Sequence, residues 1–110
     1  LELNIQELKT ISHNKFNIKL FVINNGGYVS MHNWADTFFK GRRLDTPKDT
    51  GTGTLNFKNI AKAFDLDHYL IHNFKEIDND LKKIMKNNKP LFIEVITDPR
   101  QKIYDAFKDY

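Results

Sequence analysis

The amino-acid sequence predicts an α/β fold in which helices cover a parallel β-sheet of about three strands. Two short runs, residues 18–23 and 91–96, are apolar at nearly every position, which is typical of strands covered on both faces. Segments with the helical spacing of apolar residues alternate with these runs. This alternation indicates parallel pairing through crossover helices, and therefore three layers with the sheet in the middle.

The first half of the chain is predicted to contain a helix, a strand, a helix and a loop, over residues 4–13, 18–23, 31–40 and 41–56. Ile5, Leu8 and Ile11 are three residues apart, which places them on one face of the first helix. Gly26 and Gly27 end the strand. The loop is rich in Gly, Thr, Asp, Lys and Pro, and long loops of this kind are usually functional or mobile.

The second half is predicted to contain a helix, a strand, a helix, a strand and an amphipathic tail, over residues 57–64, 68–72, 74–86, 91–96 and 100–110. Asn56 belongs to the residue types that cap helices, and it precedes the first of these elements. The helix over residues 74–86 is expected to direct four apolar side chains inward, those of Ile77, Leu81, Ile84 and Met85.

The composition limits the classes of function. The 110 residues carry a net charge of +3, and many lysines are dispersed singly, which indicates solvated faces and no nucleic-acid partner. The chain has no cysteine, which excludes disulfides and thiolate metal sites. We expect a cytoplasmic protein with no membrane partner, because no apolar segment approaches the length of a membrane span. Since the chain begins with Leu1, we also expect it to be a piece of a longer protein.

The segment Ile18-Lys-Leu-Phe-Val-Ile-Asn-Asn-Gly-Gly-Tyr28 is the candidate functional motif. Ligands of open α/β sheets bind at the carboxyl ends of the strands. Asn24 and Asn25 offer amide oxygens there, and the two glycines allow a close backbone approach, which suits Mg²⁺ and phosphate. The same residues are also ordinary for a tight turn between a strand and a helix, so both interpretations stay open at this point.

Four segments occur in an order that is typical of one enzyme family, namely Asn4-Ile-Gln-Glu-Leu8, Ile18 to Tyr28, Phe38-Phe-Lys-Gly-Arg42 and Pro90-Leu-Phe-Ile-Glu-Val95. Together they resemble the diphosphate-binding C-terminal domain of thiamine-diphosphate enzymes of the acetolactate synthase family. The cofactor motif of that family starts with Gly-Asp-Gly or Gly-Asp-Ala and ends at the double asparagine. Its first part would precede Leu1, so the resemblance implies that residues 1–110 are the latter part of the domain.

The resemblance implies thiamine diphosphate and Mg²⁺ as cofactors and assigns residues to them. Asn25 matches the asparagine whose side chain ligates magnesium, and Gly27 matches the residue that adds a main-chain carbonyl to the same ion. Tyr28, Val29 and Ser30 match the segment that runs along the cofactor.

The substrate is less well indicated by the resemblance. Trp34 matches a tryptophan that lines the substrate pocket of true acetolactate synthases, although its helical spacing from Phe38 is equally compatible with a place in the core. Arg42 is followed by Arg43 and Leu44, where the usual synthase pattern has an Arg-Tyr pair. The Gly-Gly-Tyr sequence is more similar to family members of sugar or polysaccharide pathways.

The function implied by the resemblance is part of a carboligase or decarboxylase that acts on a 2-keto acid such as pyruvate. No residue of this chain is expected to be catalytic, because the glutamate that activates the cofactor would sit on another domain of a partner subunit. The isolated chain is therefore expected to be inactive, and the parent protein to be a homodimer or tetramer. The alternative is a non-catalytic α/β regulatory or interaction module in which residues 24–27 only form a turn.

The other candidate motifs are interpreted as structural. The four histidines lack the spacing of metal ligands, apart from His68 and His72 on a predicted strand, and no zinc site is expected. Thr50-Gly-Thr-Gly-Thr54 lacks the lysine and the helix of a phosphate loop. Glu7 is expected to cap a helix or to form a salt bridge, and Glu94 is expected to face outward from its strand.

Overall fold

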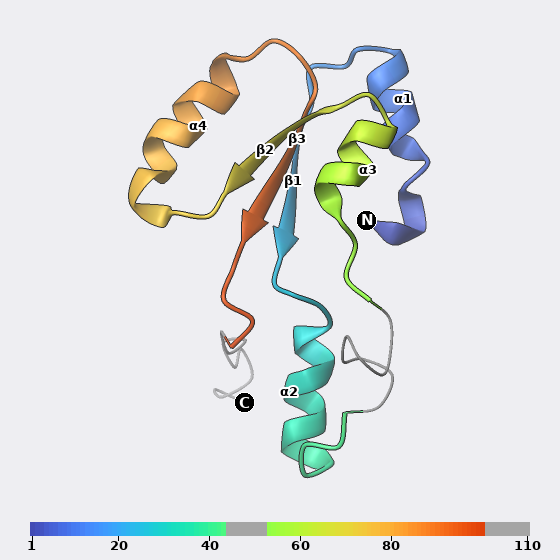
Figure 1. Cartoon of the computed structure of the whole chain (residues 1–110), viewed down its shortest axis with the longest axis vertical. Coiled ribbons are helices and arrows are strands. Elements are labelled where there is room, and N and C mark those ends of the chain that lie inside the picture. The colour runs from blue at the N-terminus through green and yellow to red at the C-terminus, as the bar shows by residue number, and fades with distance from the viewer. Residues whose placement is uncertain (44–52, 101–110) are drawn as a thin grey trace, which may run out of the picture. The chain divides into compact units, whose positions relative to one another are not determined.

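The computed structural model describes residues 1–43 and 53–100 (Figure 1). The chain divides into two compact units. The sheet unit comprises Leu1–Asn24 and Leu55–Ile96, and the α2 unit comprises Asn25–Thr54 and Thr97–Tyr110. Most of the predicted tail and most of the predicted loop lie outside the described residues.

Helices and strands alternate along the sheet unit. Its elements are η1 (Glu2–Asn4), α1 (Glu7–His13), β1 (Lys19–Asn24), α3 (Phe57–Ala63), β2 (Asp67–Ile71), η2 (Phe74–Glu76), α4 (Ile77–Lys86) and β3 (Leu91–Ile96). The α2 unit contains the helix α2 (Val29–Phe38). Within the described residues, no helix is both long and apolar enough to span a membrane.

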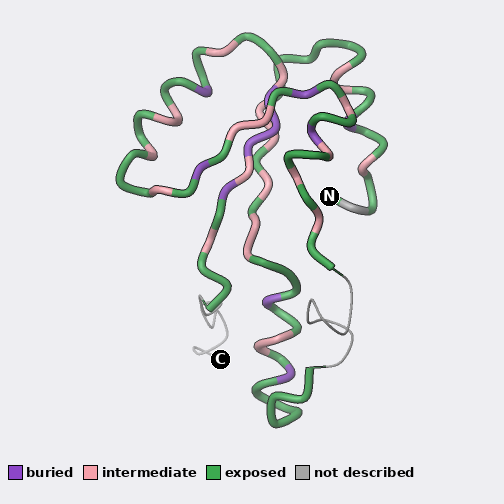
Figure 2. Tube along the Cα trace, in the orientation of Figure 1, coloured by how far each residue is buried: buried purple, intermediate pink, exposed green. Residues whose placement is uncertain are grey.

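The three strands form a parallel sheet in the order β1-β3-β2. The last strand in the chain therefore lies in the centre, with Glu94 paired to Val22 on one side and to Leu70 on the other. Buried residues concentrate on β3, as the purple trace of Figure 2 shows. The prediction of an α/β fold with a parallel sheet is confirmed.

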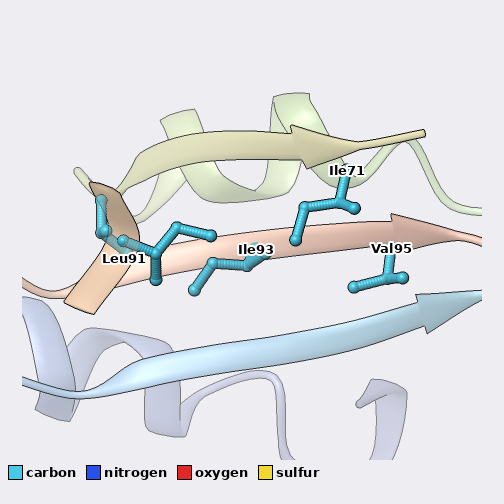
Figure 3. Close-up of a cluster of buried hydrophobic side chains, with 5 residues drawn as sticks. Ile71, Leu91, Ile93 and Val95 are labelled. Atoms are coloured by element: carbon cyan, nitrogen blue, oxygen red, sulfur yellow. The ribbon is translucent and has the colours of Figure 1, made fainter. Parts of the chain in front are cut away.

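The hydrophobic core of the sheet unit has one cluster on each face of the sheet. One cluster joins Ile84 of α4 to Ile71 of β2 and to alternate residues of β3, which Figure 3 shows as Leu91, Ile93 and Val95. The second cluster lies on the opposite face around Phe92, where α1 and α3 pack; its buried members are Leu8, Ala61, Leu66 and Phe92. The sheet is thus the middle layer of three, and β3 is covered on both faces.

Two predictions about burial are wrong. Phe21 and Ile23 of β1 are exposed, although the strand was expected to be covered on both faces. They alternate onto the face where α4 packs, and α4 contacts side chains of β2 and β3 instead. Met85 is also exposed, because the next position along a helix is turned by about 100° from the buried Ile84.

The element boundaries shift by a few residues from the predictions. The first predicted helix, over residues 4–13, is α1 and begins three residues later than predicted, and the short helix η1 precedes it. The first strand begins and ends one residue later than predicted. The strand predicted over residues 68–72 is β2, which leaves His72 outside it. Asn56 caps α3 as predicted, since its side-chain oxygen accepts a hydrogen bond of 2.9 Å from the Asn59 N–H.

Candidate functional site

The candidate motif spans the junction from the end of β1 to the start of α2. Asn24 is the last residue of β1, and Val29 is the first residue of α2. Between them, Gly26 has φ +80° and Gly27 has φ +141°, backbone conformations that residues with a Cβ rarely adopt. The two glycines are therefore required by the path of this turn.

Asn25 presents an amide oxygen in this turn. Its Oδ1 accepts a long hydrogen bond of 3.4 Å from the Gly27 N–H, and the residue is half-buried. A hydrogen bond of this length is weak, so an ion could compete for the same oxygen. None of the described polar residues is buried, so the Asn25 side chain does not enter the hydrophobic core.

The N-terminus of α2 follows directly on this turn. The first backbone N–H groups of a helix lack partners within the helix, and the helix dipole favours an anion there. In the described part of the chain no side chain caps this terminus, and the first turn holds no acidic residue. By contrast, the Asn56 side chain caps α3. The start of α2 is therefore chemically suited to a phosphate group.

The three residues expected along the cofactor differ in exposure. Tyr28 and Ser30 are exposed, and Val29 is buried. Tyr28 also has its carbonyl oxygen in the first turn, where it accepts a hydrogen bond of 3.0 Å from the His32 N–H. The exposed side chains at 28 and 30 are free to meet a ligand, and Val29 anchors the beginning of the helix.

Trp34 lies on α2 with its side chain largely exposed. Its relative exposure is 55%, and its ring centroid lies 4.4 Å from that of Phe38. The contact with Phe38 follows from the helical spacing, but neither residue is buried. Among the described residues, therefore, Trp34 does not form part of a closed core.

Arg43, which directly follows the predicted motif Phe38-Phe-Lys-Gly-Arg42, pairs with α2. Its Nε and Nη2 donate hydrogen bonds of 3.0 and 2.5 Å to the two oxygens of Asp36. These hydrogen bonds lower the pKa of the Asp36 carboxyl. The guanidinium is thus used within the α2 unit, where it holds the segment that follows the helix.

A polar network on the sheet was missed in the sequence. Glu94 was expected to face outward, but its side chain is only 12% exposed and lies 2.8 Å from the His68 ring nitrogen Nε2. Asn24 donates a hydrogen bond of 2.7 Å to the other carboxylate oxygen. The sequence did contain a signal for this network, namely a glutamate within an otherwise apolar strand. Because burial of an unpaired charge is costly, such a residue indicates that a polar partner lies nearby.

The described residues include no group of three or more His, Asp or Glu side chains arranged to hold a metal ion. Oxygen atoms of amides and of the backbone at residues 25–27 are the remaining donors in the motif, and such neutral donors suit a cation that is shared with a phosphate.

Comparison with known proteins decides the family. The model of the thiamine pyrophosphate enzyme family, C-terminal TPP binding domain, matches residues 2–95. The chain belongs to this family. The sequence motifs had indicated this membership, and the parallel sheet is consistent with it. The match covers the turn at residues 24–27 and the whole sheet except Ile96, the last residue of β3.

Several curated relatives are acetolactate synthase subunits. The large subunit of Porphyra purpurea is 31% identical over 93 residues, which are 84% of this chain and 15% of that protein. The isozyme 1 large subunit of Escherichia coli K12 is 29% identical over 104 residues, or 94% of this chain and 18% of that protein. The large subunit of Lactococcus lactis is 31% identical over 91 residues, which are 83% of this chain and 15% of that protein. The chain thus spans less than a fifth of the length of each of these relatives.

Proposed function

We propose that this chain forms the part of a thiamine-diphosphate-dependent enzyme that holds Mg²⁺ and the cofactor diphosphate. The observation that carries the proposal is the turn after β1. Asn25 offers an amide oxygen there, and the two glycines that follow it lead into the uncapped start of α2. The family match supports thiamine diphosphate as the ligand of this turn.

The donor set fits a magnesium diphosphate. The Asn25 Oδ1 and the Gly27 carbonyl would ligate the ion, and neither adds a negative charge beside the phosphates. Among the described residues, no atom lies within 4 Å of a Cβ built on Gly27, so the backbone there is open to a close approach from the side of that Cβ. Tyr28 and Ser30 would line the cofactor, and the backbone N–H groups at the start of α2 would bind phosphate oxygens.

The proposed reaction is carboligation or decarboxylation of a 2-keto acid. When bound, thiamine diphosphate supplies the carbon nucleophile and takes up the electrons that remain as carbon dioxide leaves. This chain contributes binding and orientation, and Trp34, with its exposed side chain, would contact the substrate. The named activity of the acetolactate synthase relatives supports this choice of reaction class.

The proposed activity also requires regions of the protein outside this chain. The chain corresponds to 15% to 18% of the relatives named above, so the remaining functional groups would come from other regions and from a second subunit. We expect the 110 residues alone to show no activity, and the complete protein to be a cytoplasmic dimer or tetramer. Sedimentation of the complete protein and a pyruvate decarboxylation assay of the isolated chain test these points.

The deciding experiment is Asn25→Ala in the complete protein. Loss of the amide ligand should weaken magnesium-dependent binding of thiamine diphosphate by about 2 to 4 kcal/mol, or roughly 30- to 700-fold. Isothermal titration calorimetry with and without Mg²⁺ measures this change. Asn79→Ala is the matched control, because it removes the same group from an exposed position of α4. Equal affinities for Asn25→Ala and the wild type would favour the non-catalytic module instead.

A further inference from the structure

One polar network crosses all three strands of the sheet. Asn24 ends β1, Glu94 lies in the central β3, and His68 lies in β2. The pairing of Val22 and of Leu70 with Glu94 places all three network residues on one face, because side chains two residues apart along a strand share a face. The three side chains thus form a line across the sheet.

Glu94 uses both of its oxygens in this line. Oε1 accepts a hydrogen bond of 2.7 Å from Asn24 Nδ2, and Oε2 lies 2.8 Å from His68 Nε2. The Glu94 side chain is 12% exposed and that of His68 is 14% exposed. A carboxylate that is largely removed from water requires such partners, and its two hydrogen bonds hold it in one orientation.

The His68 ring is held from a second side. It contacts the ring of the fully buried Phe92 with centroids 6.2 Å apart. Phe92 in turn contacts Phe57 of α3 at 6.1 Å. The network is therefore anchored in the core on the β2 side, and its other end is Asn24, the residue that precedes the candidate magnesium ligand.

We propose that Glu94 is a positioning residue for the magnesium ligand Asn25. The carboxylate holds the Asn24 amide and thereby the last residue of β1, from which the chain continues directly into the turn at residues 25–27. Because the end of β1 is held in one conformation, the adjoining Asn25 has fewer conformations to choose from before the ion binds. Less conformational entropy is then lost when Asn25 is ordered by binding. This proposal rests on the proposed function, because it assigns a role within the same cofactor-binding turn.

The test uses polarity changes at both ends of the Asn24–Glu94 hydrogen bond in the complete protein. Asn24→Asp places a second carboxylate against Glu94 and should weaken Mg²⁺-dependent binding of thiamine diphosphate at least tenfold. Adding Glu94→Gln should restore the affinity to within threefold of the wild type. The glutamine amide nitrogen can then donate to the new carboxylate, while its oxygen accepts from the His68 ring.

Two further variants complete the series. Glu94→Gln alone keeps a side-chain oxygen that can accept the hydrogen bond from the Asn24 amide, so its affinity should stay within threefold of the wild type. Glu7→Gln makes the same change at an exposed position of α1 and should have no effect. Affinities are measured by calorimetry below the unfolding temperature of each variant, which is recorded separately by thermal unfolding.

The outcomes separate the possible failures. Restored affinity in the double variant supports the proposal, because loss of a direct contact between Asn24 and the ligand would not be repaired at Glu94. Wild-type affinity in Asn24→Asp overturns it, as does a double variant that binds as weakly as Asn24→Asp. Lower unfolding temperatures with unchanged affinities likewise overturn it and leave a structural role. Absence of magnesium-dependent binding in the wild type overturns the proposed function itself.

Discussion

Replacing Gly27 by alanine tests whether the turn after β1 has the backbone conformation described above. Gly27 has φ +141°, and in the part of the chain that the structure describes a Cβ built there meets no atom within 4 Å. Steric collision therefore contributes nothing, and the cost of the alanine is backbone strain alone. For a residue held in such a conformation this strain is about 1 to 3 kcal/mol. We expect Gly27→Ala to destabilise the start of α2 by that amount.

Hydrogen exchange of the His32 amide in the cofactor-free complete protein measures this destabilisation. The amide donates a hydrogen bond of 3.0 Å to the Tyr28 carbonyl in the first turn of α2. Opening of this turn would release the strain, so the exchange rate should rise by roughly 5- to 140-fold. Gly53→Ala is the control, because its Cβ also meets open space and its φ lies outside the left-handed region. A His32 exchange rate within twofold of the wild type in Gly27→Ala would refute the argument.

Two further predictions concern the core and an exposed ion pair. Ile84→Ala should lower the free energy of unfolding by about 2 to 5 kcal/mol, because Ile84 is 1% exposed, whereas Met85→Ala at the adjacent exposed position should change it by less than about 0.5 kcal/mol. Urea unfolding of the complete protein compares the two variants. Equal decreases in the free energy of unfolding would contradict the burial of Ile84 and the exposure of Met85. Hydrogen bonds from the Arg100 side chain and backbone lower the pKa of the Asp98 carboxyl to about 2. Arg100→Gln should raise that pKa toward 3.8 in an NMR titration, and an unchanged midpoint would argue against the side-chain contact.

The direction of the pH effect follows from the sign of this shift. The pKa of Asp98 is lower in the folded protein than in an unfolded chain, so the ionised carboxylate favours the folded state above a pH of about 4. This contribution is lost as the pH falls from about 4 to about 2. Because the pair lies at the surface, solvent and salt screen it, and the effect on overall stability should be small.

The strands and their parallel pairing could be predicted because their signals are local. The run from Leu91 to Ile96 is apolar enough to indicate a buried strand, and its bounds agree with the structure. Likewise, Asn56 was expected to cap a helix and does so, since the capping hydrogen bond reaches only three residues along the chain. Local chemistry of this kind does not depend on the order of the strands.

Burial could not be predicted from the same local patterns. Phe21 and Ile23 lie in a strand as apolar as β3, yet they are exposed, because β1 is at the edge of the described sheet and α4 packs over the other two strands. Met85 satisfies an apolar pattern but lies just beyond the contact stripe of α4. Which apolar residue is covered depends on the neighbours that tertiary structure supplies.

The candidate site was recognised through a combination of motifs, and each residue alone was ambiguous. Asn25 and Gly27 are as compatible with a turn as with a metal site, and the structure shows that they do form a turn. A turn and a cation site are therefore not mutually exclusive interpretations of these residues, because backbone carbonyl and amide oxygens in a turn are also ligands for a hard cation. Ligand binding remains the distinguishing measurement.

Glu94 shows why strand order carries functional information that a linear pattern lacks. In an edge strand, a glutamate between Ile93 and Val95 could reach water, and the interpretation as an outward-facing residue would have been reasonable. The order β1-β3-β2 instead places Glu94 between two neighbours, Asn24 on one side and His68 on the other. The carboxylate must then be satisfied across the sheet, and it connects the core near His68 to the residue that precedes the proposed magnesium ligand. A charged residue in a central strand is therefore best interpreted through the strands on both sides of it.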